Sequence, residues 1–125
     1  MENSDSNCDS RWFFAVESSG DGVWDWNYET GAVYYSSQWK SMLGYKDDEI
    51  ANRLSEWKRR IHRDDLNDIR RALTRCINGK SLRYECQHRL LCKDGKYKWI
   101  LTRGRVVEKT ADGKPLRIVG THTDI

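Results

Sequence analysis

Three long segments of alternating apolar and polar residues fill the C-terminal part of the chain, and Asp-Gly pairs separate them. The segments span residues 82–91, 97–108 and 116–123, and the pairs lie at 94–95 and 112–113. Asp-Gly favours tight turns between strands because its glycine adopts a positive φ at no steric cost. The sequence therefore predicts three antiparallel strands in a meander, which limits the possible folds more than any other feature.

The longest helical pattern precedes these strands, over residues 64–78. Its apolar positions, three and four residues apart, are Leu66, Ile69, Leu73 and Ile77. This spacing is typical of the buried face of a helix, and burial of the four side chains contributes roughly 6 to 12 kcal/mol before entropy is counted. We expect Asp64 to cap the helix and the apolar face to lie on the sheet.

Shorter elements are expected in the N-terminal half. Residues 23–28 alternate, and a Thr-Gly pair separates them from residues 32–35, which predicts a β-hairpin. Ser36 or Ser37 can cap a short helix that ends at Gly44.

Two further helical turns are expected over residues 46–50 and 55–61. The order of elements predicts an α+β domain, in which a five-stranded antiparallel sheet carries short helices and one longer helix on one face. We expect the first and last strands to be neighbours, because the short hairpin needs a pairing partner. Residues 20–125 are assigned to this domain, and residues 1–19 to a flexible N-terminus with a short amphipathic helix.

The charge balance excludes strongly electrostatic partners. There are 22 Lys and Arg residues against 19 Asp and Glu residues, a formal net charge of +3. The many aromatic residues could stack on single-stranded nucleic acid, but no basic groove accompanies them, so this remains a remote alternative. No apolar run is long enough to cross a membrane and no secretory signal is visible, so we expect a cytoplasmic protein without membrane insertion.

No catalytic or metal-binding constellation is apparent. The four cysteines, expected to be free thiols, form no C-x-x-C pair: Cys8, Cys76, Cys86 and Cys92. His62, Asp64 and Asp65 could form a proton relay or a metal site, but we interpret them as the start of a helix. Residues 78–81 resemble the end of a phosphate loop, but they follow a helix and precede a strand, so we interpret them as a turn. We therefore predict that the chain is not an enzyme and binds no metal.

A series of short motifs, in this order, resembles the PAS domain family, and in particular its bacterial sensor branch with a C-terminal PAC motif. The first half contains Gly22-Val-Trp-Asp-Trp-Asn27, Thr30-Gly31, Trp39-x-x-Met-Leu-Gly-Tyr45 and Ile61-His-Arg-Asp-Asp65. The closing half contains Tyr84-Glu85, Lys93-Asp94-Gly95, Trp99, Arg103-Gly104, Asp112-Gly113, Gly120-Thr121 and Asp124-Ile125. Arg63 stands where the family has proline, which suits the first turn of a helix.

The resemblance implies a sensory or signal-relay module of a multidomain receptor, such as a histidine kinase of a two-component system or a diguanylate cyclase. It also implies a homodimer and a downstream effector domain. Flavin-binding relatives use a cysteine in an Asn-Cys-Arg setting, whereas Cys76 here follows Arg75 near the end of the long helix. Haem in the family needs a histidine on that helix, and residues 65–78 contain none. We therefore expect no cofactor.

A ligand pocket, if present, is expected between the long helix and the sheet. Its candidate residues are Trp39, Met42, Leu43, Leu66, Ile69, Leu73, Tyr84, Cys86, His88 and Thr102. For His88, a hydrogen-bonded structural role is favoured over a ligand contact. A small-molecule sensor predicts a cavity there, and a ligand-free protein–protein interaction domain predicts a space filled by Trp and Leu. The many large aromatic residues favour a small or filled pocket.

The end of the last predicted strand is a candidate signal junction, made of Arg103, Asp124 and Ile125. We expect Asp124 to pair with Arg103 on the neighbouring strand and to fix the angle at which the chain leaves the domain. A partly exposed pair of this kind contributes only about 0.2 to 1 kcal/mol, so its value would lie in orientation.

An apolar cluster near the N-terminus is a candidate dimerisation surface. It consists of Trp12, Phe13, Phe14 and Val16. These side chains are too apolar to leave in water on an isolated helix, so we expect them to mediate self-association, or to cover the sheet of the same chain.

Overall fold

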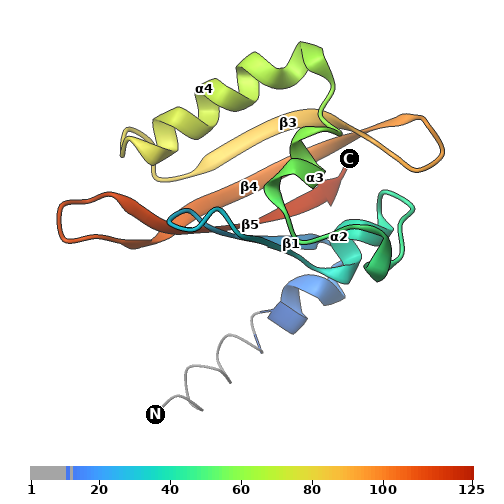
Figure 1. Ribbon diagram of the computed structural model, residues 1–125, viewed down its shortest axis with the longest axis horizontal. Helices are drawn as coiled ribbons and strands as arrows, with labels where there is room; N and C mark the ends of the chain where they lie inside the picture. Colours follow the sequence, from blue (N-terminus) through green and yellow to red (C-terminus); the bar gives the residue numbers. More distant parts are fainter. Residues whose placement is uncertain (1–10, 12) are drawn as a thin grey trace.

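Five strands form a single antiparallel sheet in the order β2-β1-β5-β4-β3 (Figure 1). The computed structural model describes residue 11 and residues 13–125. The strands are β1 (Gly22–Asn27), β2 (Val33–Tyr35), β3 (Tyr84–Leu91), β4 (Tyr97–Lys109) and β5 (Pro115–Asp124). The predicted meander is present, and the first and last strands are neighbours, as expected.

The helical elements pack mainly against β1 and β3. They are α2 (Ser37–Ser41), η1 (Asp47–Glu49), α3 (Leu54–Lys58), η2 (Arg63–Asp65) and α4 (Leu66–Ile77), and residues 13–18 are also helical. In Figure 1, α4 runs along β3 at one end of the sheet and α2 lies beside β1 at the other. A core of fully buried side chains separates these helices from the sheet: Trp39, Leu43, Ile50, Leu90, Ile100 and Ile118.

The start of the long helix differs from the prediction. Asp64 does not cap it; instead the His62 Nδ1 accepts a hydrogen bond from the Asp64 amide at 3.1 Å, and η2 leads into α4. Asp65 is held by Arg89, whose side chain donates to both of its carboxylate oxygens at 2.9 and 3.1 Å. Leu66 was expected on the sheet but is 39% exposed, because it lies at the first turn, before the helix settles onto β3.

Three glycines of the predicted motifs lie where aromatic rings touch the sheet. Gly104 and Gly120 pair across β4 and β5, and the Trp24 ring lies against both. A Cβ on Gly120 would lie 2.3 Å from Trp24 Cζ2, and one on Gly104 would lie 2.6 Å from Trp24 Cη2. A Cβ on Gly22 would lie 2.5 Å from the Cα of Trp39. These glycines are therefore required by close approach rather than by an unusual backbone conformation.

Candidate functional site

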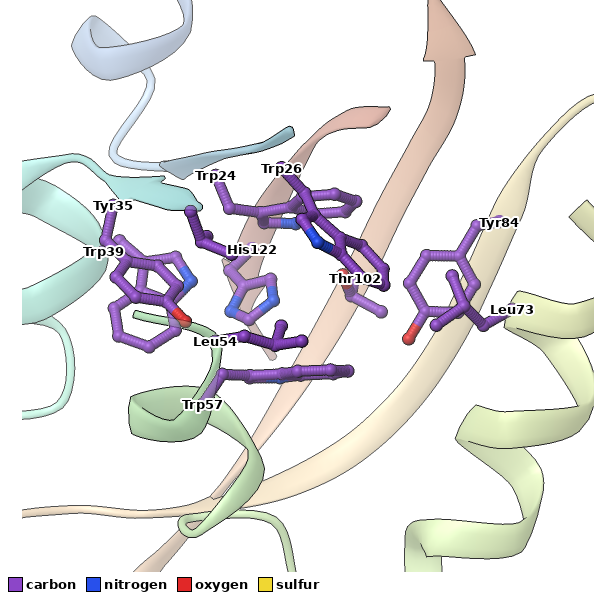
Figure 2. A pocket seen from close by; sticks show the side chains of 11 residues that line it. Trp24, Trp26, Tyr35, Trp39, Leu54, Trp57, Leu73, Tyr84, Thr102 and His122 are labelled. Atoms are coloured by element: carbon purple, nitrogen blue, oxygen red, sulfur yellow. The ribbon is translucent and has the colours of Figure 1, made fainter. Parts of the chain in front are cut away.

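An aromatic pocket lies between the sheet, α3 and α4, as Figure 2 shows. Its lining residues are Trp24, Trp26, Val33, Tyr35, Trp39, Leu54, Trp57, Leu73, Tyr84, Thr102 and His122. The cavity left between them is about 30 Å³, counted as the space open to the centre of a water-sized sphere. Since a water needs about 10–15 Å³ on this measure, the remaining space holds about two waters. The pocket is thus nearly filled by its own rings.

Four of the candidate pocket residues belong to this lining: Trp39, Leu73, Tyr84 and Thr102. The others lie elsewhere. Ile69 and His88 are buried next to the pocket, and Cys86 is half-buried on β3. Met42 and Leu43 follow the end of α2 and border a separate open groove that Lys98 also lines, although the Leu43 side chain is buried in the core.

The sequence prediction missed lining residues at both ends of the chain. Trp24 and Trp26 were correctly expected on one face of their strand, but the pattern could not say that this face meets the long helix. His122 lies on β5 opposite Thr102 on β4, and only the strand register brings the two together. Leu54 and Trp57 come from the short helix α3. The spacing of apolar residues in so short a helix does not show which of its sides faces the core.

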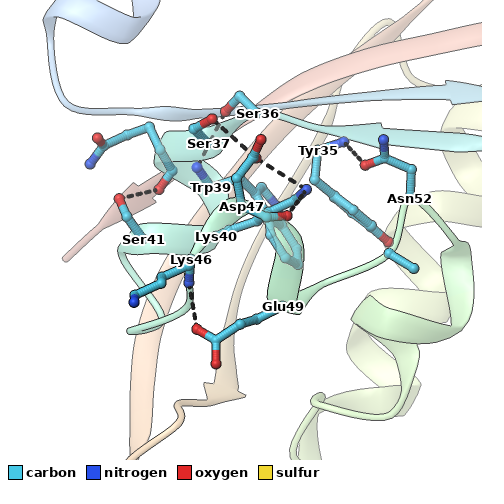
Figure 3. Close-up of polar contacts among 12 residues, drawn as sticks. Tyr35, Ser36, Ser37, Trp39, Lys40, Ser41, Lys46, Asp47, Glu49 and Asn52 are labelled. Carbon is cyan, nitrogen blue, oxygen red and sulfur yellow. Dashed lines mark hydrogen bonds and ion pairs between the residues drawn. The ribbon is translucent and has the colours of Figure 1, made fainter.

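A network of hydrogen bonds fixes the wall of the pocket that carries Trp39 (Figure 3). Ser36 caps α2: its hydroxyl oxygen accepts hydrogen bonds from the Trp39 amide at 3.2 Å and from the Val23 amide at 2.8 Å. Lys40 is buried and donates to the Asp47 carbonyl at 2.9 Å, while its ammonium lies 3.2 Å from the Asp47 carboxylate. The hydrogen bond from Lys40 lowers the pKa of the Asp47 carboxyl. These bonds tie α2 to β1 and to η1.

Aromatic rings form a continuous series through the pocket. Trp39 stacks on Tyr35 with 4.0 Å between ring centroids and lies 5.4 Å from His122. The His122 ring lies 5.6 Å from His88, and the His88 ring lies 5.9 Å from Trp57. The indole Nε1–H of Trp57 donates to the His88 Nε2 at 3.2 Å. Since Nε2 accepts this bond, it carries no proton.

Both histidines of this series are neutral at pH 7. Burial lowers the pKa of His88 to about 4. Burial, together with repulsion from His88, also moves the pKa of His122 well below its usual range. Burial raises the pKa of the Tyr84 phenol, so this group stays protonated and can donate a hydrogen bond. None of the described residues that line the pocket is charged at neutral pH.

Five buried polar groups of the lining find no hydrogen-bond partner among the residues that the structure describes. They are the indole Nε1 atoms of Trp24, Trp26 and Trp39 and the hydroxyl oxygens of Tyr84 and Thr102. Buried polar groups are normally paired, and an unpaired one costs about 1–3 kcal/mol. Five such groups belong to the side chains that border one cavity.

The predicted ion pair between Asp124 and Arg103 is wrong. The register of β4 and β5 places Arg103 opposite Thr121, three residues away from Asp124. Arg103 instead lies 3.7 Å from the Glu85 carboxylate on β3.

Lys98 is the partner of Asp124. Its ammonium lies 2.9 Å from the Asp124 carboxylate and donates to the Met42 carbonyl at 2.8 Å. The next residue, Ile125, donates its amide hydrogen to the Trp99 carbonyl at 3.2 Å. Lys98 therefore joins the end of β5 to the segment that follows α2, the helix that carries Trp39.

The N-terminal apolar cluster is partly described. Trp12 lies outside the described residues. Phe13 and Val16 are half-buried, and the Phe13 ring lies 6.4 Å from Tyr34 on β2. Phe14 is 65% exposed. Part of the cluster thus covers the chain's own sheet, and Phe14 faces solvent.

Known proteins share this fold. A family model described as PAS fold matches residues 32–122. The chain belongs to the PAS family. A sensory box histidine kinase/response regulator from Burkholderia thailandensis has a similar structure, with a TM-score of 0.80 and 33% identity over 92% of this chain and 84% of that one. This PAS domain is a module of sensory signalling.

Two further relatives place the domain in a wider setting. A blue-light-activated histidine kinase from Brucella anthropi is 26% identical over 90% of this chain, and the chain spans only 22% of that protein. The N-terminal domain of a diguanylate cyclase with a PAS/PAC sensor from Marinobacter aquaeolei shares the fold. Its TM-score is 0.70 and its identity 24%, over 83% of this chain and 94% of that one.

Other features of the described residues limit the chemistry of this PAS domain. Cys76, Cys86 and Cys92 are free thiols, while Cys8 lies outside the described residues. Within residues 11 and 13–125, no three His, Cys, Asp or Glu side chains come together as a metal site. No helix in this part of the chain has the length and apolar character needed to cross a membrane.

Proposed function

We propose that this PAS domain senses a small molecule in the aromatic pocket and passes the signal, through the end of β5, to an effector domain of a larger receptor. The five unpartnered donors around the cavity carry this proposal. A ligand that accepts hydrogen bonds from them would be bound in preference to water. The proposal assigns no catalytic step to the chain.

The alternative is a ligand-free interaction domain, and the filled pocket supports it in part. A core that serves only to fill space, however, is most stable when its contacts are apolar. Buried donors without partners lower the stability of such a core. Thr102 and Tyr84 could be replaced there by Val and Phe at no cost in packing. The unpaired buried groups therefore favour a ligand site over a core that only fills space.

A flavin or a haem does not fit the pocket. No cysteine is among the described lining residues, and the cavity of about 30 Å³ is far too small for a multi-ring group. Of the histidines nearby, His88 already accepts a hydrogen bond from Trp57. The purified protein is therefore expected to be colourless. Its absorption spectrum should show protein bands alone, and a stoichiometric visible band would contradict this assignment.

Lys98 offers a route from the pocket to the effector. A ligand that displaces Trp39 moves α2, and the hydrogen bond from Lys98 to the Met42 carbonyl transfers that movement to Asp124. Such a relay is a shift between two arrangements of the exit.

Replacing Lys98 by methionine is expected to uncouple the exit from the pocket. Because the ion pair is partly exposed, the substitution should lower the stability by only about 1 kcal/mol. In amide NMR spectra, signals of Asp124 and Ile125 should respond to a pocket ligand in the wild type and not in this variant. Arg103→Met is the matched control and should leave the response intact, since Arg103 pairs with Glu85. An unchanged response in Lys98→Met would rule out this route.

Residues 20–125 are proposed to act as the PAS and PAC unit of a two-component receptor or related protein, as a homodimer in the cytoplasm. The exposed Phe14 supports dimerisation through the N-terminal segment, residues 1–19. Sedimentation at rising concentration should show a dimer, and Phe14→Ser should shift it to monomer. A wild-type protein that stays monomeric would contradict this part of the proposal.

Ligand sensing itself can be tested by thermal shift against a library of small neutral metabolites. A ligand that binds only the folded state raises the melting temperature by mass action. Leu73→Phe would fill the remaining cavity and should abolish the shift, whereas Leu66→Phe, on the exposed first turn of the same helix, should not. Shifts that survive Leu73→Phe would place the binding site outside the pocket.

A further inference from the structure

The unpartnered groups of the pocket share one chemical character. Trp24, Trp26 and Trp39 each present an indole N–H, which donates a hydrogen bond and cannot accept one. The hydroxyls of Tyr84 and Thr102 can donate as well. A ligand that pairs with these groups must carry hydrogen-bond acceptors, and a ligand rich in N–H groups would leave the indoles unpaired.

The surroundings of these donors offer no counter-charge to an ionised ligand. The described lining holds no Asp, Glu, Lys or Arg, and its one histidine, His122, is buried and uncharged at pH 7. His88, next to it, is likewise neutral. A carboxylate or phosphate would lose its hydration here without gaining a counter-charge. An ammonium ion would meet ring faces and two hydroxyl oxygens, but the three indole N–H groups cannot accept a hydrogen bond from it.

The shape of the pocket selects a flat molecule. Seven of its lining side chains, with the imidazole of His122 included, are aromatic rings, and aromatic rings pair best by offset stacking or edge-to-face contact. The cavity must widen to admit even one ring. Trp26, Leu54, Trp57 and Leu73 are half-buried, so these lining residues have room to move toward solvent.

We propose that the aromatic pocket takes a compact, planar and uncharged molecule whose edge carries hydrogen-bond acceptors, such as ring carbonyl or N-oxide oxygens. This inference rests on the proposed sensory function and adds the chemical class of the ligand. The acceptor oxygens of the ligand lie toward the indoles of Trp24 and Trp26 on β1, and its ring lies between the aromatic side chains.

Four one-ring probes separate this class from the others. Pyridine N-oxide is neutral and a strong acceptor, toluene has the same shape without an acceptor, benzoate is an anion and benzylammonium is a cation. By calorimetric titration, pyridine N-oxide should bind at least about tenfold more tightly than each of the other three. Sites built to hydrogen-bond a ligand often discriminate by more than this against analogues that lack the polar group.

Each other result has a distinct meaning. If toluene binds as tightly as pyridine N-oxide, or if either ion binds more tightly, the proposed ligand class is wrong while a ligand-binding pocket remains. If none of the four probes binds at millimolar concentration, the proposed ligand class is wrong, and the sensory function is then decided by the thermal-shift library alone.

Two variants give a second readout in folded protein. Thr102→Val and Tyr84→Phe each remove a buried hydroxyl that has no partner, so each should melt no lower than the wild type. Each should also weaken the binding of pyridine N-oxide, by about fivefold or more.

The matched control is Thr121→Val. Thr121 is next to His122 on β5 and therefore points to the opposite face of the sheet, so affinity should not change. If Thr102→Val and Tyr84→Phe bind pyridine N-oxide as tightly as Thr121→Val does, their hydroxyls are not ligand donors and the inference is overturned.

Discussion

Replacing Gly120 by alanine is expected to destabilise this PAS domain by about 4 kcal/mol or more, a large part of the stability of a small domain. The new Cβ would lie 2.1 Å from the Arg103 carbonyl oxygen and 2.3 Å from Trp24 Cζ2. The carbonyl belongs to the backbone of β4 and cannot move without disturbing the pairing of β4 with β5. The Trp24 ring cannot move away without entering the pocket.

Gly113→Ala is the matched control for this experiment. Gly113 lies in the turn between β4 and β5 with φ +88°, and a Cβ there would meet nothing within 4 Å. Its replacement should cost only about 1–2 kcal/mol of backbone strain. Urea unfolding followed by circular dichroism measures both variants. Equal losses would contradict the close contact between Trp24 and the paired glycines.

The second large effect is a loss of stability in mild acid. An unfolded histidine takes up a proton near pH 6.5, whereas His88 in the folded protein does so only near pH 4. Between these values the unfolded state binds more protons, so the free energy of unfolding falls as the pH is lowered through this range. The full shift corresponds to roughly 3 kcal/mol for His88 at pH 4, and His122 acts in the same direction.

Urea unfolding at several pH values between 7 and 4.5 measures this dependence. The window lies above the range where carboxylates take up most of their protons, including Asp65, whose pKa is lowered by the hydrogen bond from Arg89. His122→Phe should reduce the slope of stability against pH, because one buried site no longer titrates. His62→Gln, which changes a more exposed ring, is the control. A stability that is flat over this window would show that the two histidines titrate normally.

The fold could be predicted from local patterns because most of its elements follow local rules. The two Asp-Gly turns, the serine cap at Ser36 and the left-handed residue Gly44, with φ 90°, lie where the sequence placed them. The neighbouring first and last strands followed from the need to pair a short hairpin.

The ion pairs could not be predicted because they depend on strand register and on distant partners. A shift of three residues along β4 and β5 decides that Asp124 meets Lys98 instead of Arg103. Asp65 was expected to serve the start of the helix, but it is bound by Arg89, 24 residues further along the chain.

The candidate site was found only in part. The long helix and β3 pointed to Leu73 and Tyr84, because their buried faces could be read from spacing. The facing wall, with Trp24 and His122, depends on how the two ends of the chain meet in the sheet. Gly104 and Gly120 could be identified in the sequence motifs, but their contact with Trp24 can be seen only in the three-dimensional structure.

The aromatic pocket is proposed to present free indole donors to an acceptor ligand. Nitrogen-15 NMR of the indole Nε1–H groups tests it most directly, because the chain has six tryptophans and single Trp→Phe variants can assign their signals. With pyridine N-oxide, signals of Trp24, Trp26 and Trp39 should move downfield as hydrogen bonds form. The signal of Trp99, which is exposed and does not line the pocket, should change least. If Trp57 alone responds, or if the three pocket indoles stay in place at saturation, the pocket does not work as proposed.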